Sequence, residues 1–147
     1  MPINEIIRFI PVSEQLATSG QPSEAQLAEL AAAGFELIIN LALHDDPRYS
    51  LPDEPGCVAA LGMDYVHIPV PFSAPTAGHL VRFFEAMGRA ENRRTLVHCA
   101  HNKRVSVFLA LYRFECLGWP VEQARQAMLT GWTPDPVWQA FFDHHAA

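Results

Sequence analysis

The sequence lacks the long apolar run that a membrane-spanning helix needs, and it lacks the basic surplus of a nucleic-acid-binding surface. It has 147 residues, of which half are apolar, and a formal charge of −6 at neutral pH. A helix that crosses a bilayer takes about 20 consecutive apolar residues, and no run here approaches that length. Duplex DNA or RNA attracts basic surfaces, so the acidic balance argues against such a partner. We therefore expect neither a membrane nor a nucleic-acid duplex as a partner.

Cysteine is also scarce. The three cysteines, Cys57, Cys99 and Cys116, form an odd and widely spaced set, which is not a disulfide framework. The opening residues, MPINEIIRF, lack the basic start and apolar stretch of a secretory signal peptide. A reducing cytoplasm is the simplest expectation for such a chain.

Runs of β-branched and apolar residues predict the strands of a central sheet. The run FELIINLAL has the unbroken apolar character of a strand that is buried on both faces. The segment after it is rich in proline and aspartate, so we expect a long surface loop there that can include one helical turn. Strands are expected at residues 6–12, 16–20, 35–43, 64–70 and 95–99, and the long loop at 44–62.

Helices are expected between these strands and through the last third of the chain. Ser23 and Gln26 fit a capping box, and Gly34 ends the helix that they open. The run SVFLALYRFECLG is apolar almost all round, which is typical of a buried central helix. Helices are expected at residues 23–34, 76–87, 106–118, 120–131 and 136–145. We predict a single α/β domain over residues 1–147, with a mostly parallel central sheet, helices on both faces and a helical C-terminal third.

A histidine and a cysteine, His98 and Cys99, end one apolar run, and the polar loop AHNKR leads into the central helix. Ligands of open α/β sheets collect beyond the carboxyl ends of the strands. Free N–H groups at a helix N-terminus attract anions and favour the thiolate form of a cysteine placed there. The alternative is that Cys99 is a small buried apolar residue, as most free cysteines are. Lys103 and Arg104 favour the reactive interpretation, since a packing cysteine has no need of two cations beside it.

The segment HCAHNKRVS resembles the phosphate-binding loop of cysteine-dependent protein tyrosine and dual-specificity phosphatases, whose pattern is H-C-x-x-G-x-x-R-[ST]. The segments TSGQPSEAQLAELAAAGFELIINL and YVHIPVPFSAPT are similar to a group of small bacterial phosphatase-like proteins, some of them fused to metallo-β-lactamase-like hydrolases. The resemblance covers roughly residues 10–115. It implies a protein-tyrosine-phosphatase-like fold of the dual-specificity type, a phosphorylated small molecule or phosphoprotein as substrate, and no cofactor.

The resemblance also implies roles for individual residues. The Cys99 thiolate would attack phosphorus and form a phosphocysteine that water then hydrolyses. Ser106 would support the departing thiolate, and His98 would orient the loop from behind. Arg104 would supply positive charge. The phosphate oxygens would be held by the backbone of Ala100, His101, Asn102, Lys103, Arg104 and Val105.

Two catalytic groups are displaced from the family pattern. The arginine that should stand six residues after the cysteine is Arg104, one step early, and Val105 occupies its place. A guanidinium clamps two phosphate oxygens, and losing one preorganised donor costs on the order of a hundred- to a thousandfold in rate, so activity should be weak. The glycine of the pattern is Asn102, a residue that tolerates positive φ.

The general acid is the second displaced group. The segment PFSAPT, where the resembling phosphatases carry an aspartate, has no carboxylate. His101 could supply a proton near neutral pH. Asp45 and Asp46 follow another strand end and could approach the same rim, although a solvated turn is the simpler interpretation of these two.

Two other functions fit part of this pattern. Rhodanese-like sulfurtransferases use a shorter loop with arginine five residues after the cysteine, and Cys99 to Arg104 has that spacing. A non-catalytic phosphate or phosphoprotein binder would keep the loop and lose the chemistry. A metal site is not expected, because H-C-x-H places its ligands too close together for a usual tetrahedral zinc site.

Overall fold

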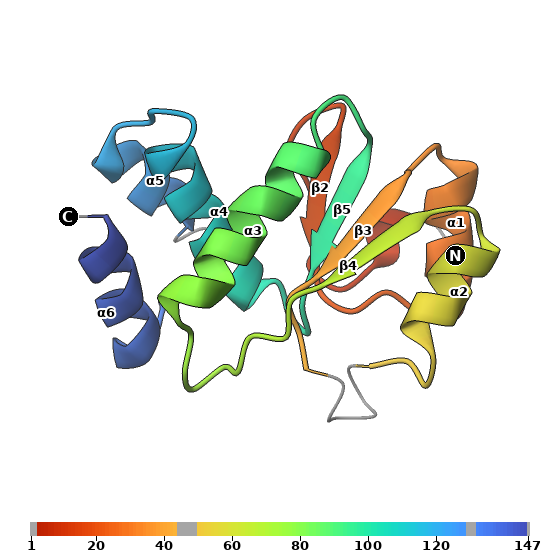
Figure 1. Cartoon of the computed structure of the whole chain (residues 1–147), viewed down its shortest axis with the longest axis horizontal. Helices are drawn as coiled ribbons and strands as arrows, with labels where there is room; N and C mark the ends of the chain where they lie inside the picture. The colour runs from red at the N-terminus through yellow and green to blue at the C-terminus, as the bar shows by residue number, and fades with distance from the viewer. Residues whose placement is uncertain (1–2, 44–49, 129–131, 147) are drawn as a thin grey trace.

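The computed structural model describes residues 3–43, 50–128 and 132–146, and a five-stranded sheet lies at its centre (Figure 1). In spatial order the strands are β1 (Ile10–Pro11), β2 (Leu16–Ser19), β5 (Thr95–His98), β3 (Leu37–Asn40) and β4 (Asp64–His67). Neighbouring strands from β2 to β4 are parallel, and only β1 is antiparallel to its neighbour. The mostly parallel sheet predicted from the sequence is confirmed, and β5 is its central strand.

Helices cover both faces of this sheet, as the sequence predicts. One face is covered by α1 and α2, and the other by α3 to α6, so each face has its own apolar core (Figure 1). The helices are α1 (Glu24–Ala32), α2 (Glu54–Ala60), α3 (Ala77–Arg89), α4 (Lys103–Glu115), α5 (Val121–Met128) and α6 (Pro136–His145), and a 3₁₀ turn spans Ile3–Glu5. In the described part of the chain, no helix is both long and apolar enough to cross a bilayer.

Two predicted elements differ from the structure. The strand predicted over residues 6–12 is reduced to β1, because Arg8 adopts a left-handed conformation (φ 46°) that interrupts an extended chain. The loop predicted over residues 44–62 contains the seven-residue helix α2, which Asp53 caps by accepting a hydrogen bond from the Gly56 N–H. Residues 44–49 lie outside the described part.

The carboxyl ends of the four parallel strands form one row across the sheet. Ser19 pairs with His98, His98 with Asn40, and Asn40 with His67. Side chains in one such row point to the same face, and the next residue along a strand points to the opposite face. His98 therefore faces α2, whereas Cys99 packs in the core that includes α3 and α4.

The start of α3 has a capping box that contains a titratable residue. Thr76 Oγ1 accepts a hydrogen bond from the His79 N–H (3.3 Å), and His79 Nδ1 accepts one from the Thr76 N–H (3.1 Å). Nδ1 can accept only while it carries no proton. Burial, with a smaller contribution from Arg82, lowers the pKa of His79 below its ordinary value of 6.5.

Replacing His79 with glutamine should reduce the loss of stability in mild acid. Folded His79 holds its proton less tightly than His79 in the unfolded chain does. Its contribution to the free energy of unfolding is therefore complete above about pH 6.5 and is lost as the pH falls below that value. Glutamine at this position accepts the same hydrogen bond at every pH. Urea midpoints at pH 7.5 and 5.5 should differ less for His79→Gln than for the parent. Thr76→Ala, the control, should be less stable at both pH values, and an unchanged pH difference in His79→Gln would contradict the assignment.

Candidate active site

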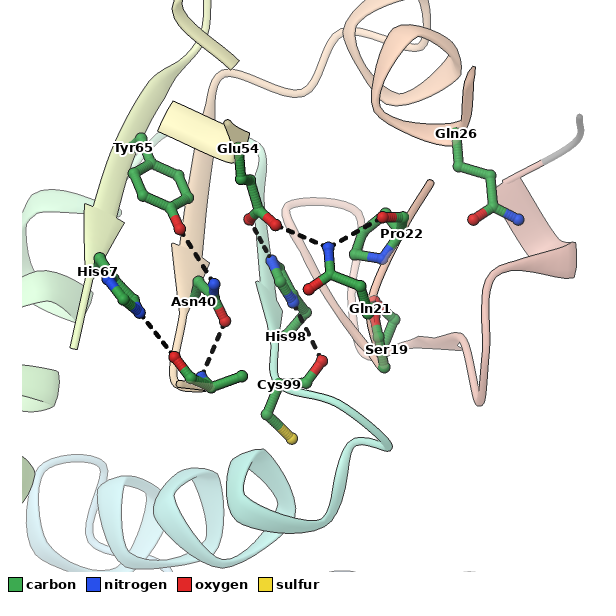
Figure 2. Close-up of polar contacts among 12 residues, drawn as sticks. Ser19, Gln21, Pro22, Gln26, Asn40, Glu54, Tyr65, His67, His98 and Cys99 are labelled. Carbon is green, nitrogen blue, oxygen red and sulfur yellow. Dashed lines mark hydrogen bonds and ion pairs between the residues drawn. The ribbon is translucent and has the colours of Figure 1, made fainter. Parts of the chain in front are cut away.

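Cys99 lies at the first position after β5, and its side chain is directed toward the start of α4. Figure 2 shows the sulfur on the α4 side and the His98 ring on the opposite side of the chain. The Cys99 N–H donates to the Ser19 carbonyl (3.3 Å), and the residue is 1% exposed. A thiol at the base of a loop and a packing cysteine are both buried in this way, so the geometry of the surrounding loop distinguishes the two roles.

The loop after Cys99 is held in place by the segment that follows β2. The Gln21 N–H donates to the Ala100 carbonyl (2.9 Å), and a single β-bridge pairs Gly20 with His101. A Cβ atom on Gly20 would collide with the Ala100 carbonyl oxygen, so only glycine permits this close approach. The SGQ sequence is thus needed to fix the loop, a role that sequence reasoning did not assign to it.

Asn102 provides the turn that ends the loop. It adopts the left-handed conformation expected for it (φ 65°, ψ 11°) and stands just before α4. Its side-chain nitrogen donates to the Arg8 carbonyl and to Thr18 Oγ1, each at 3.0 Å. The amide therefore links the loop to the N-terminal segment and to β2, in addition to replacing the glycine of the family pattern.

Several backbone N–H groups of the loop are without acceptors. Those of Ala100, Lys103, Arg104 and Val105 donate no hydrogen bond within the part of the chain that the structure describes. The first N–H groups of a helix have no partner inside the helix, and here they belong to the loop and first turn that follow Cys99. Such groups, with the helix dipole, are suited to hold an anion the size of phosphate.

Arg104 and Val105 face different surroundings. Val105 is fully buried in the apolar core. The Arg104 guanidinium donates to the Val70 carbonyl (2.9 Å) and lies over the Phe72 ring, 5.7 Å from its centroid. It has no carboxylate partner among the described residues. The displaced arginine is therefore directed to the segment after β4, where the resembling phosphatases carry the general acid.

Ser106 and Lys103 both contact Trp132. The Ser106 hydroxyl donates to the Lys103 carbonyl (2.7 Å) and accepts from the Trp132 indole N–H (2.8 Å). The Lys103 ammonium lies 5.5 Å from the centroid of the Trp132 ring. These hydrogen bonds of Ser106 do not reach Cys99, and its role toward the thiolate remains a prediction.

His98 belongs to a buried network on the α2 side of the sheet, shown in Figure 2. Its Nε2 lies 2.6 Å from Glu54 Oε2, and both side chains are fully buried. Its Nδ1 lies 3.1 Å from the Cys99 carbonyl oxygen, and Gln21 Nε2 donates to Glu54 Oε1 (2.7 Å). The two ring nitrogens of His98 thus contact the Glu54 carboxyl group and a main-chain carbonyl, and the Glu54 carboxyl group also accepts from Gln21. The network contacts the main chain at Cys99 on the side opposite the thiol, and the role of His98 in orienting the loop remains a prediction.

The same network continues across the sheet to β3 and β4. Asn40 Nδ2 donates to the Tyr65 hydroxyl (3.0 Å), and His67 Nε2 lies 2.6 Å from the Ala42 carbonyl oxygen. Burial, followed by the charge of Glu54, raises the pKa of Tyr65 strongly. Sequence reasoning missed Glu54, because an acidic residue in the first turn of a helix is ordinary and nothing local marks it as buried.

The general-acid candidates are only partly described. Asp45 and Asp46 lie outside the described residues. His101 is half-buried within the loop. The Phe72 carbonyl accepts from the Trp138 indole N–H (2.8 Å), and this segment brings no carboxylate to the loop. Among the described residues, no three histidine, cysteine, aspartate or glutamate side chains are grouped to hold a metal ion.

Together these features define a class. A cysteine ends a central parallel strand, a loop of N–H groups without acceptors in the described chain follows it, and a buried helix lies beyond; Tk-PTP, with TM-score 0.77 and 20% identity over 91% of this chain and 92% of that one, shares the fold. The chain belongs to the family described as the phosphatase-like domain of Beta-lactamase hydrolase-like proteins, whose model matches residues 7–115.

Individual relatives agree with this assignment. The Beta-lactamase hydrolase-like protein of Agrobacterium fabrum (strain C58) is 32% identical over 112 residues, which cover 72% of this chain and 24% of that protein. The chain thus spans about a quarter of the length of the curated relatives that it matches. A candidate phosphatase from Shewanella putrefaciens CN-32 has a crystal structure with TM-score 0.87 and 33% identity, covering 98% of this chain and 94% of that one. TpbA from P. aeruginosa, crystallised with pTyr, has TM-score 0.70 and 19% identity, covering 95% and 88% of the two chains, and shows the shared fold alone.

Proposed function

We propose that this chain is a cysteine-dependent phosphatase that hydrolyses a phosphomonoester through a phosphocysteine intermediate. The proposal rests on one observation: Cys99 is followed by a loop and helix start in which four N–H groups have no acceptor in the described chain. The Cys99 thiolate attacks phosphorus, the ester oxygen leaves with a proton, and water then cleaves the sulfur–phosphorus bond to release inorganic phosphate. The substrate is a phosphorylated small molecule or phosphoprotein, in line with pTyr in the TpbA complex.

The remaining site residues act around this step. The backbone of residues 100 to 105 holds the phosphate oxygens, and Arg104 adds charge after leaving the Val70 carbonyl. His98, fixed by Glu54, orients the main chain at Cys99. Ser106 supports the departing thiolate.

His101, Asp45 or Asp46 protonates the leaving group. The scheme requires no cofactor, and its reduced thiol favours the cytoplasm as the location.

We also propose that residues 1–147 form a single domain. The family model ends at residue 115, but the chain continues through α5 and α6. Trp138 and Phe142 of α6 are fully buried in the same core as Cys99 and Val105. The C-terminal helices therefore complete the core under the loop.

A paired assay tests the proposed reaction. The purified protein is incubated with 4-nitrophenyl phosphate and, separately, with thiosulfate and cyanide. Release of phosphate supports the phosphatase. Formation of thiocyanate instead supports a sulfurtransferase, for which Cys99 and Arg104 have the right spacing. Saturable binding of inorganic phosphate without either reaction supports the non-catalytic binder and contradicts the proposal.

Replacing Arg104 with methionine should lower kcat for 4-nitrophenyl phosphate by about a hundredfold. The guanidinium is proposed to stabilise charge that develops on the phosphoryl oxygens, and removal of one such donor typically costs about 10²–10³ in rate. Methionine keeps an unbranched apolar side chain at this buried position and removes only the guanidinium that lies over Phe72. The control is Lys103→Met, which removes the adjacent charge and should cost less than about tenfold. Equal losses in both variants would show that the loop needs positive charge in general rather than the Arg104 guanidinium.

A further inference from the structure

A cavity of about 670 Å³ lies beside the candidate active site and is separate from the thiol. It is lined by the N-terminal segment at residues 8–12, by Thr18 of β2, by α4, by Ala127 near the end of α5 and by Trp132. Asn102 and Ser106 contribute to its wall, but Cys99 does not. The mechanism proposed above therefore makes no use of this space.

The lining of the cavity has the character of a small-molecule site. Most of it is apolar, and a few polar groups (Thr18, Asn102 and Ser106) lie at the side next to the loop. Ligand sites have volumes of about 300–1,000 Å³ and combine an apolar wall with a few polar groups. The apolar part of the wall is formed by Phe9, Ile10, Pro11, Val12, Leu109, Ala127 and Trp132.

The charged residues of the wall are both cations. They are Arg8 and Arg113, and none of the lining residues is acidic. Arg113 is half-buried and lies over the Trp119 ring at 4.5 Å, without a carboxylate partner in the described part of the chain. Burial lowers the pKa of Arg113, since part of its hydration is lost without an anion to replace it. An acidic group in the cavity would supply that anion.

We propose that this cavity binds a small amphipathic anion, an apolar body with a carboxylate head, and that Arg113 holds the carboxylate. The apolar body fills the space between Leu109, Ala127 and Trp132. Trp132 also donates to Ser106, so the ligand contacts a residue that is hydrogen-bonded to the first turn of α4. This proposal does not depend on the phosphatase activity, since no cavity residue supplies the nucleophile, although Asn102 and Ser106 line the cavity and also belong to the proposed active site.

Three unbranched eight-carbon probes with different heads test the charge preference. Octanoate, 1-octanol and octylamine are titrated into the full chain by calorimetry. Octanoate should bind saturably with a Kd below about 1 mM, and octylamine at least about tenfold more weakly. Absence of saturable octanoate binding, or equal binding of octanoate and octylamine, overturns the proposal.

Three variants locate the bound probe. Arg113→Met should weaken octanoate binding by about tenfold and leave 1-octanol binding unchanged, because it removes the charge and keeps an apolar stem. Ala127→Phe, which fills the cavity, should abolish the binding of both. The matched control is Arg89→Met, which removes an exposed arginine of α3 outside the cavity and should change nothing. Octanoate binding that survives Ala127→Phe, or that inorganic phosphate displaces, would place the probe elsewhere and overturn the assignment.

Discussion

Replacing Cys99 with serine should abolish phosphate release from 4-nitrophenyl phosphate, a loss of about a thousandfold or more, while inorganic phosphate still binds. A serine hydroxyl is a far weaker nucleophile than a thiolate at neutral pH unless a base activates it. Serine is close to cysteine in volume, so the loop and its unpartnered N–H groups should be kept. Nitrophenol release measures the loss, and calorimetry with inorganic phosphate shows whether the anion site remains.

The exposed Cys116 supplies the matched control for this variant. Cys116→Ser at the end of α4 should retain full activity, since it removes a thiol that is distant from the loop in sequence and lies at the surface. If Cys99→Ser hydrolyses the ester as fast as the parent, the covalent mechanism is wrong. If it loses phosphate binding together with stability, Cys99 serves the core alone, as its 1% exposure also permits.

The fold could be predicted from the sequence because its signals are local. The unbroken apolar run of β3, the capping box at Ser23 and the cap at Thr76 each mark an element within a few residues. The helix α2 was predicted only as a single turn within a loop because its sequence, EPGCVAA, contains a proline and a glycine, and the Asp53 cap marks its start. The spatial order of the strands required the structure.

The candidate site could be predicted only as far as its backbone. The apolar run that ends at Cys99 and the polar loop after it predicted a thiol near the N-terminus of a helix. Asn102 predicted the turn between them. The direction of Arg104 toward Val70 depends on a contact 34 residues away in the sequence. The pairing of His98 with Glu54 spans 44 residues, and no spacing rule connects them.

Removing the carboxylate of Glu54 should reduce the free energy of unfolding by about 3–5 kcal/mol. Removing one partner of a fully buried hydrogen-bonded contact leaves the remaining polar groups unsatisfied, at a cost of about 1–3 kcal/mol for each group, whereas an exposed pair contributes at most about 1 kcal/mol. In Glu54→Ala, the His98 ring and Gln21 Nε2 both lose the acceptor that Figure 2 shows between them. Urea unfolding at pH 7.5 measures the change. Glu54→Gln, which keeps one carbonyl acceptor, should lose less.

Glu24 is the matched control, because it is also the first residue of a helix but is exposed. Glu24→Ala should cost at most about 1 kcal/mol, the contribution of an acidic residue to the helix dipole. A double-mutant cycle with His98→Ala should give a coupling of about 1–3 kcal/mol between Glu54 and His98. Additive losses would mean that the two side chains are stabilised independently, and that Glu54 does not hold the ring that contacts the Cys99 carbonyl.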